Sequence, residues 1–228
     1  RQAVVAADLI GVTGIDVACA SPVDLVAAGS AYSDLIGRAK VKLLAANVRG
    51  PNGAPLGAET EVREVGGLRV GMFALAGPDE LAGVEHPGVT VLDPEAAARS
   101  AIGALRDRAD VIVLLSSLGL RETKRLVRKV EGIDFAVAGG MRDHATYSDE
   151  AELVGATRVM QFHTEGRYVG RLALGMVGGA RDWVDASTAS AAELAQLDER
   201  VKRLEEELAE LTRTRKPTDP DIKSMGHE

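Results

Sequence analysis

The fold of this chain is decided at residues 108–119, which read Arg-Ala-Asp-Val-Ile-Val-Leu-Leu-Ser-Ser-Leu-Gly. The run Asp110–Ser116 is short and almost wholly apolar, and a glycine follows it closely. Such a run is typical of a strand that is buried on both faces of a sheet. An amphipathic helix is expected next, over Arg121–Val130, and then a second apolar strand over Ile133–Ala138. This order of strand, helix and strand predicts a mixed α/β architecture.

Upstream of this stretch, the pattern predicts a hairpin and a capped helix. Glu61–Val65 and Leu68–Leu75 flank Gly66-Gly67, a two-residue turn that can take positive φ at both positions. Asp93-Pro94 predicts the start of a helix that runs through Leu105, with the aspartate as N-cap and the proline at the first helical position.

The remaining elements follow from the same periodicities. Some of the predicted strands are apolar on both faces. Helices or a second sheet are therefore expected to cover both faces of the sheet that contains them. We expect helices over residues 2–12 and 31–39, and strands over Ile15–Ala20, Lys42–Val48, Val159–Phe162 and Tyr168–Leu174.

Composition narrows the classes of function and partner. The net charge of −7 argues against nucleic acid as a main partner, because phosphate binding favours a basic surface. The single cysteine, Cys19, cannot form an internal disulfide, and its apolar surroundings in sequence predict a small buried residue. No apolar stretch approaches the ~20 residues that a membrane span needs, so we predict no transmembrane segment.

The end of the chain has a different character. Between Ala191 and Thr214 the composition shifts to Glu, Arg, Lys, Leu and Ala, and apolar residues recur at alternating steps of three and four. This heptad pattern predicts a coiled-coil-like helix over 187–215 that forms a homo-oligomer. The alternative is a helix that lies on its own domain. Residues 216–228, with Pro217 and Pro220, are predicted to be a disordered tail. The seam consists of Leu194, Leu197, Val201, Leu204, Leu208 and Leu211.

Residue chemistry alone indicates no reaction. The four histidines have no spacing that makes a local metal site, and there is no cysteine and histidine motif. The glycine pairs fall short of a phosphate-binding loop, and no Gly-x-Ser-x-Gly sequence occurs. The histidines are His86, His144, His163 and His227.

The order of the segments carries more information than any one motif. The set runs Gly14–Ala18, Leu44–Val48, Val65–Phe73, Arg108–Gly119, Gly132–Gly140 and Glu165–Leu172. In this order and spacing, residues 3–175 resemble the calcineurin-like metallophosphoesterase domain of bacterial periplasmic 5′-nucleotidases. The resemblance implies an αββα sandwich of mixed sheets over residues 1–180, incomplete at the N-terminus, because the family's opening metal motifs should lie upstream of Arg1. It also implies a periplasmic or extracytoplasmic location.

The family's later metal motifs are altered in this chain. A Gly-Asn-His-Glu motif is expected after the strand at Ile15–Ala20, and Pro22 and Val23 stand at its Asn and His positions, with Asp24 at the acidic one. The His of a Ser-His-x-Gly element is replaced by Ser117. A His-x-His element after Gly139-Gly140 is replaced by Met141 and Asp143.

These replacements predict loss of the family's chemistry. Two divalent metals clamp the phosphoryl group and activate water in that family. Proline and valine supply no ligand, methionine is too soft for hard divalent ions, and serine is a weak neutral ligand. The hypothesis is therefore a domain with no resident metal or cofactor that acts in binding or assembly.

Two alternatives remain open. One is an active Mn- or Zn-dependent phosphoesterase whose rebuilt site uses Asp24, Asp143 and His144 together with upstream residues. The other is a binder of a small phosphorylated ligand in the vacated cleft. His163 is expected to be a packed or surface residue.

Overall fold

The computed structural model describes residues 2–85, 88–139, 151–162 and 170–174. The chain divides into two compact units, Arg1–Arg181 and Asp182–Glu228, and all described residues belong to the first. The predicted heptad helix over 187–215 and the tail over 216–228 lie outside the described residues.

A six-stranded mixed sheet forms the centre of the first unit. Its strands lie in the order β4-β5-β7-β8-β10-β9. The four inner strands are parallel to one another, and the two edge strands are antiparallel to their neighbours. The strands are β4 (Glu61–Val65), β5 (Leu68–Leu75), β7 (Val111–Ser116), β8 (Phe135–Ala138), β9 (Glu152–Val154) and β10 (Thr157–Met160).

The predicted hairpin and the predicted strand after it are confirmed. Val65 pairs with Leu68 across the turn, and Gly66 and Gly67 have φ values of 60° and 84°. These angles favour glycine and allow the tight two-residue connection. β7 lies between β5 and β8, and every residue of its register with β5 is paired from Val111 to Ser116.

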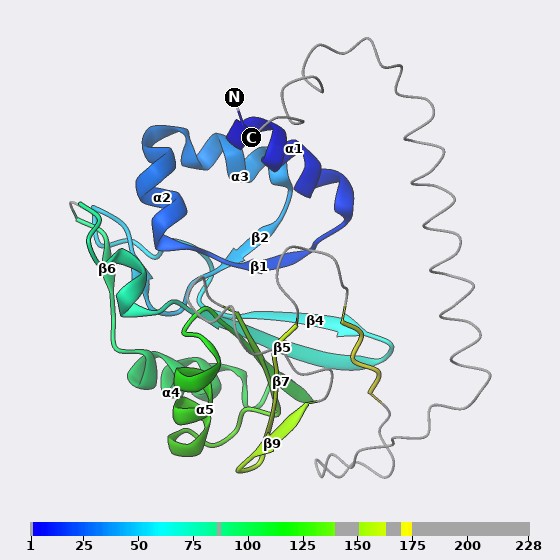
Figure 1. Ribbon diagram of the computed structural model, residues 1–228. Coiled ribbons are helices and arrows are strands. Elements are labelled where there is room, and N and C mark those ends of the chain that lie inside the picture. Colours follow the sequence, from blue (N-terminus) through cyan, green and yellow to red (C-terminus); the bar gives the residue numbers. More distant parts are fainter. Residues whose placement is uncertain (1, 86–87, 140–150, 163–169, 175–228) are drawn as a thin grey trace, which may run out of the picture. The chain divides into compact units, whose positions relative to one another are not determined.

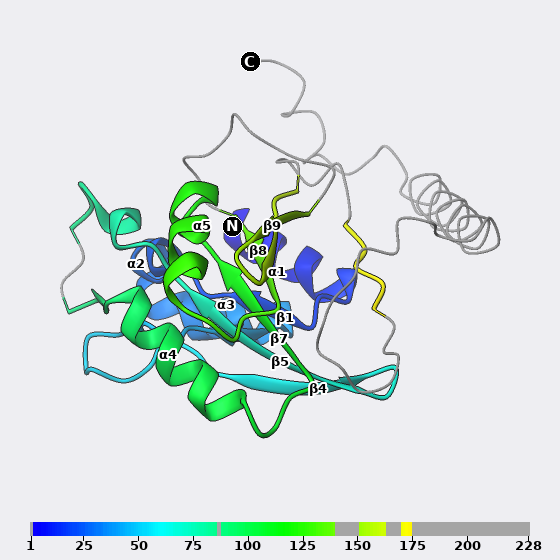
Figure 2. The same cartoon turned by 90° about the horizontal axis from the view of Figure 1, so that it is seen from below.

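Two helices, α4 (Pro94–Leu105) and α5 (Leu120–Lys129), cover one face of this sheet (Figure 2). Asp93 caps α4, because its Oδ1 accepts a hydrogen bond from the Ala96 N–H at 2.7 Å. The helices and the sheet enclose the largest apolar core of the described residues, which includes Phe73, Leu105 and Leu114, all fully buried.

A second, smaller layer lies on the other face of the sheet (Figure 1). Here β1 (Val17–Cys19) pairs in parallel with β2 (Lys42–Leu44), and β1 contacts β5 and β7. Beyond these strands lie α1 (Gln2–Thr13), α2 (Pro22–Ala28) and α3 (Tyr32–Ala39), with the 3₁₀ turn η1 (Gly29–Ala31) between the last two. The layers therefore run helices, small sheet, large sheet, helices, as the resemblance implied.

Short elements join the two layers. β3 (Val48–Arg49) pairs with β6 (Thr90–Val91), and the 3₁₀ turn η2 (Pro78–Leu81) follows β5. No described helix combines the length and hydropathy that a bilayer span requires.

The prediction of one strand over Lys42–Val48 is wrong, because the strand breaks around Asn47. This side chain is fully buried and donates from Nδ2 to the carbonyl oxygens of Ala76 (2.9 Å) and Leu92 (3.2 Å). Its Oδ1 accepts from the Ala76 N–H at 2.8 Å. Three backbone groups, two of them in buried bonds to Ala76, thus depend on one amide, and the chain bends to place it.

Other boundaries also differ from the predictions. The last strand of the sheet is Thr157–Met160, two residues earlier than the predicted Val159–Phe162. The predicted strand at Tyr168–Leu174 is absent from its described part, residues 170–174, which have no regular structure. The helix at Pro22–Ala28 was not predicted, although Ser21 followed by Pro22 is a helix-start signal.

Candidate functional site

Of the motif positions that the sequence marks as altered, those that the structure describes follow the carboxyl ends of β1 and β7. The stretch Ser21–Asp24 follows β1, and Ser117 follows β7 directly. In open α/β sheets, loops at the carboxyl ends of parallel strands form the usual ligand site. The described motif positions therefore lie where a fold of this kind places its ligand site.

The stretch after β1 has become a helix start. The Ser21 hydroxyl accepts a hydrogen bond from the Asp24 N–H at 3.4 Å and caps α2. Pro22 occupies the first turn and is buried, and Val23 packs against an apolar cluster that includes Ala76 and Leu81. The two positions that replace Asn and His therefore contribute to packing.

Asp24 lies in the first turn of α2, where the helix dipole favours a carboxylate. Desolvation raises its pKa above the ordinary value. Tyr32 on α3 is buried, and desolvation, followed by the charge of Asp24, raises its pKa to about 12. Asp24 and Tyr32 are thus electrostatically coupled without the support of a described cation.

Ser117 is held by an internal hydrogen bond. Its hydroxyl donates to Oε1 of Glu80, a residue of η2, and lies 3.2 Å from the Leu75 carbonyl oxygen. The same Glu80 oxygen accepts from the Gly77 N–H at 2.9 Å. The carboxylate therefore accepts from two donors of the protein itself, the Ser117 hydroxyl and the Gly77 N–H.

Cys19 completes this cluster from the end of β1. Its Sγ lies 3.9 Å from the Ser117 Oγ and 3.8 Å from the Leu75 carbonyl oxygen. Burial raises the pKa of the Cys19 thiol to about 11, and the charge of Glu80 contributes in the same direction. The residue as a whole is half-buried, whereas the sequence predicted a buried one. It is neutral at pH 7, and so it is a poor nucleophile and a poor metal ligand.

The described donors do not fit a dinuclear metal centre. Within residues 2–85, 88–139, 151–162 and 170–174, no group of three or more His, Cys, Asp or Glu side chains could hold a metal ion. Met141, Asp143, His144 and His163 lie outside the described residues. Ser117 and Asp24 are brought to the same end of the fold, but not into one ligand set.

Sequence reasoning missed Glu80 and the role of Cys19. The signal for Glu80 is the spacing of Gly77-Pro78-Asp79-Glu80, in which a glutamate three residues after an N-cap bonds back to the cap N–H. Periodicity gave no indication that Glu80 would also meet Ser117, because 37 positions separate them in the chain.

A separate hollow of about 280 Å³ lies beside α4. Its wall contains Arg49, Glu59 and Asp93, and the Arg49 guanidinium already pairs with Glu59 at 2.6 Å. A phosphorylated ligand would therefore face two carboxylates and a cation that is already neutralised. The charge of the hollow therefore does not suit a phosphate.

No family model matches the sequence, and no curated protein matches it. Among solved structures, similar chains include the SoxB sulfate thiohydrolase of Thermus thermophilus, at 20% identity and a TM-score of 0.58 over 66% of this chain. A 5′-nucleotidase precursor, also from Thermus thermophilus, has 27% identity and a TM-score of 0.53 over 64% of this chain. The calcineurin-like phosphoesterase YfkN of Bacillus subtilis has 18% identity and a TM-score of 0.55 over 71%.

This chain covers only part of the length of each of these proteins. This chain spans 28% of the SoxB chain, 32% of the 5′-nucleotidase chain and 60% of the YfkN chain. The described residues therefore have the fold of a partial metallophosphoesterase-like domain, with a mixed sheet and flanking helices.

Proposed function

We propose that this chain is a non-catalytic metallophosphoesterase-like domain that acts in binding or assembly. The observation that carries the proposal is the hydrogen bond from Ser117 to Glu80. Ser117 stands at the position where, by the resemblance, the family places a histidine ligand. The hydrogen bond satisfies the Ser117 hydroxyl and the Glu80 carboxylate without a cation.

This hydrogen bond opposes a metal in two ways. A serine hydroxyl is a weak neutral ligand, and here its proton is already donated to a carboxylate. The carboxylate oxygen, which would be the stronger ligand, also accepts the Gly77 N–H. A metal that recruited this oxygen would compete with the Gly77 N–H for its acceptor and would leave the Ser117 hydroxyl only the Leu75 carbonyl oxygen at 3.2 Å, which costs free energy in a partly buried site.

The positions after β1 support the same proposal. Asn and His in the family motif must point toward metal and substrate, whereas Pro22 is buried here and Val23 packs against apolar neighbours. Replacement of polar ligands by side chains that stabilise the fold is expected where the scaffold is kept and the chemistry is not.

Assembly is the role that the rest of the sequence favours. The heptad seam of 187–215 carries the predicted self-association, and the net charge of −7 disfavours nucleic acid as a partner. The resemblance to 5′-nucleotidases further supports a periplasmic or other extracytoplasmic location.

The test is metal content and hydrolysis with the full chain. Purified protein incubated with Mn²⁺ or Zn²⁺ and then desalted is expected to retain less than one metal ion per two chains. It is expected to hydrolyse p-nitrophenyl phosphate and AMP no faster than the buffer with metal alone. Two retained metal ions per chain together with metal-dependent hydrolysis would overturn the proposal.

Matched variants separate the proposal from the rebuilt-site alternative. The alternative requires Asp24, Asp143 and His144, so Asp143→Ala would abolish any metal-dependent rate. Asp79→Ala removes an exposed carboxylate next to Glu80 and serves as the control. Loss of hydrolysis in Asp143→Ala with retention in Asp79→Ala would establish the alternative.

The other alternative is that the chain binds a small phosphorylated ligand. In that case AMP is expected to raise the melting temperature of the protein.

A further inference from the structure

The chain contains two asparagines, Asn47 and Asn52, and the structure gives them opposite surroundings. Asn47 is fully buried, and its amide makes three hydrogen bonds to backbone groups. Asn52 lies in the exposed turn of residues 50–53, which follows β3. The same type of side chain is therefore held on all sides in one place and open to water in the other.

The residue that follows each asparagine also differs. Val48 follows Asn47, and its β-branched side chain crowds its own backbone nitrogen. Gly53 follows Asn52, has a φ of 75°, and would offer a Cβ no contact within 4 Å. The nitrogen of Gly53 and the Cγ of Asn52 can close a five-membered ring, and the missing side chain at Gly53 leaves this approach unhindered.

One hydrogen bond of the turn favours attack on the side-chain carbonyl of Asn52. Its Oδ1 accepts from the Ala54 N–H at 3.1 Å, as in other turns that begin with asparagine. Negative charge develops on this oxygen when a nucleophile adds to Cγ, and a donor that is already in place stabilises it. The Nδ2 group, which would leave, has no hydrogen-bond partner in the part of the chain that the structure describes.

A second hydrogen bond opposes the attack, and its strength sets the expected rate. The Gly53 N–H donates to the Gly50 carbonyl oxygen at 2.9 Å, and this bond must break before the nitrogen can lose its proton. Because a single exposed hydrogen bond contributes little net free energy, it should slow the reaction by no more than about tenfold relative to the unfolded chain.

We infer that Asn52 is a site of spontaneous deamidation, at which water converts the side-chain amide to a carboxylate. Hydroxide removes the Gly53 amide proton, and this nitrogen forms a bond to Cγ of Asn52. The bond from Cγ to Nδ2 then breaks, and Nδ2 takes up a proton and leaves as ammonia. Water adds to one of the two carbonyl carbons of the cyclic imide, the bond from that carbon to the Gly53 nitrogen breaks, and the nitrogen regains a proton. One water is consumed and one ammonia is released, without oxidation or reduction.

The two products of ring opening affect the turn differently. Opening at Cγ gives aspartate, which keeps the backbone and adds one negative charge. Opening at the main-chain carbonyl carbon gives isoaspartate, whose backbone runs through Cγ and is longer by one carbon. That extra carbon disrupts the turn bonds from Gly53 to Gly50 and from the Gly50 N–H to the Ala54 carbonyl oxygen, the latter 2.8 Å long.

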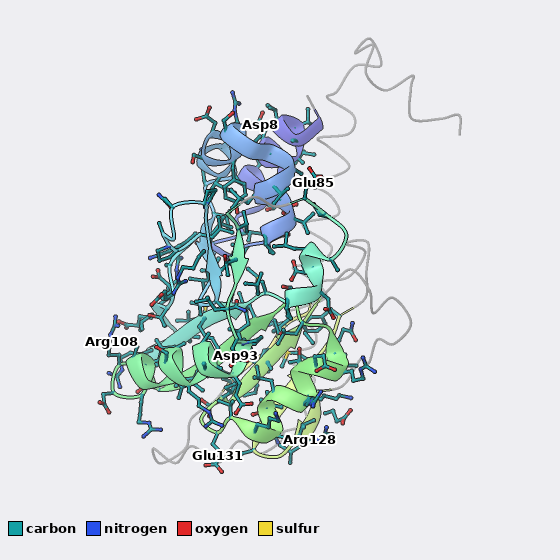
Figure 3. The ribbon with its side chains drawn as sticks, turned by 90° about the vertical axis from the view of Figure 1, so that its left-hand side faces the viewer. Asp8, Glu85, Asp93, Arg108, Arg128 and Glu131 are labelled. Atoms are coloured by element: carbon teal, nitrogen blue, oxygen red, sulfur yellow. The ribbon has the colours of Figure 1, made fainter. Side chains whose placement is uncertain are left out.

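Both products place the new charge near the hollow beside α4. Arg49 pairs with Glu59 at 2.6 Å, and both line this hollow together with Asp93, which stands at the start of α4 (Figure 3). Three residues of chain separate the Cα atoms of Arg49 and Asn52 by at most about 11 Å. The added carboxylate is therefore only partly screened from Arg49, and the modification makes this region more negative.

The test incubates the full chain at pH 8 and follows its tryptic peptides by mass spectrometry. Trypsin places the two asparagines in separate peptides, residues 43–49 and 50–63. Peptide 50–63 should gain the mass that replacement of an amide by an acid adds, at a rate within about tenfold of the rate in guanidinium. Peptide 43–49 should stay unchanged, and the rate for peptide 50–63 should be lower at pH 6, where hydroxide is scarcer.

Two outcomes of this incubation would overturn the inference. One is a folded protein that stays unmodified while the chain in guanidinium is converted, because the turn would then protect Asn52. The other is equal conversion of Asn47 and Asn52 in the folded protein. Neither outcome bears on metal content or hydrolysis, so the inference and the proposed function fail separately.

The matched variant is Asn52→Gln, which keeps a side-chain amide but would have to close a less favourable six-membered ring. After the same incubation, protein isoaspartyl methyltransferase with a labelled methyl donor should label the unchanged chain and leave the Asn52→Gln protein unlabelled. Circular dichroism checks that the variant is folded, which is expected because residue 52 is exposed. Equal labelling of the two proteins would place the reaction at another residue and contradict the assignment to Asn52.

Discussion

The six-stranded sheet and the β1–β2 sheet differ in how completely they are covered. The six-stranded sheet has helices on one face and the second layer on the other, and side chains such as Phe73 and Leu114 are fully buried. The β1–β2 layer has three-residue strands whose β1 residues are all half-buried. Most of the free energy of folding must therefore come from the larger sheet, while the described motif positions, Pro22–Asp24 and Ser117, follow strands of both layers.

The largest expected effect separates these regions directly. Phe73→Ala in β5 removes a fully buried ring from the main core and should lower the free energy of unfolding by about 3–5 kcal/mol. Leu9→Ala in α1 is the control, and it should cost less than about 0.5 kcal/mol in the monomer because Leu9 is half exposed. Urea denaturation with circular dichroism measures both.

If Phe73→Ala and Leu9→Ala lowered the free energy of unfolding equally, the distinction between a covered and an uncovered layer would be wrong. The comparison should be repeated at two protein concentrations, because any self-association of the folded chain adds to apparent stability.

The second-largest effect on the free energy of unfolding is expected at Asn47, which connects the layers. Asn47→Ala leaves the Ala76 N–H and the carbonyl oxygens of Ala76 and Leu92 without partners, and it should cost about 2–4 kcal/mol. Asn52→Ala removes a side chain of the same type that bonds only the Ala54 N–H in an exposed turn, at 3.1 Å. It should cost less than about 1 kcal/mol. A small loss for Asn47→Ala would mean that the amide is not needed to hold the break between β2 and β3.

Local signals predicted the larger sheet well, and the reason is physical. β7 is an uninterrupted apolar run, the Gly66-Gly67 turn requires positive φ, and Asp93-Pro94 is a strong helix start. Each of these features is decided by neighbours in sequence. The break at Asn47 was missed because the partners of its amide lie 29 and 45 positions away.

The site was predictable only as a set of positions. The order of segments located Pro22, Val23, Asp24 and Ser117 just after two strands; in the structure the first three lie in the first turn of α2, and Ser117 directly follows β7. The resemblance could not reveal what each replacement contacts. The bond from Ser117 to Glu80 depends on η2 folding back beside β7, which is a tertiary arrangement that no spacing in the sequence encodes.

The bond between Ser117 and Glu80 gives the third effect. Ser117→Ala and Glu80→Ala, measured singly and together, should show a coupling free energy of about 1–2 kcal/mol, because each single change removes the hydrogen bond to a charged, partly buried acceptor. Ser100→Ala on the exposed side of α4 is the control, with a change within about 0.5 kcal/mol. Strict additivity of the two single variants would show that the hydroxyl and the carboxylate do not interact in solution.

The smallest effect concerns Cys19 and leaves stability at neutral pH unchanged. Burial raises the pKa of its thiol to about 11 from 9.0, so the folded protein keeps a proton that the unfolded chain releases above pH 9. Stability should therefore fall as the pH rises from 9 through 11.

At pH 8, alkylation by iodoacetamide should be about 100-fold slower in the folded protein than in guanidinium, because the thiolate is the reactive form. Glu80→Gln should speed alkylation, since the nearby charge contributes to the raised pKa. A rate in the folded protein equal to that in guanidinium would show that Cys19 is not enclosed between β1, β5 and β7.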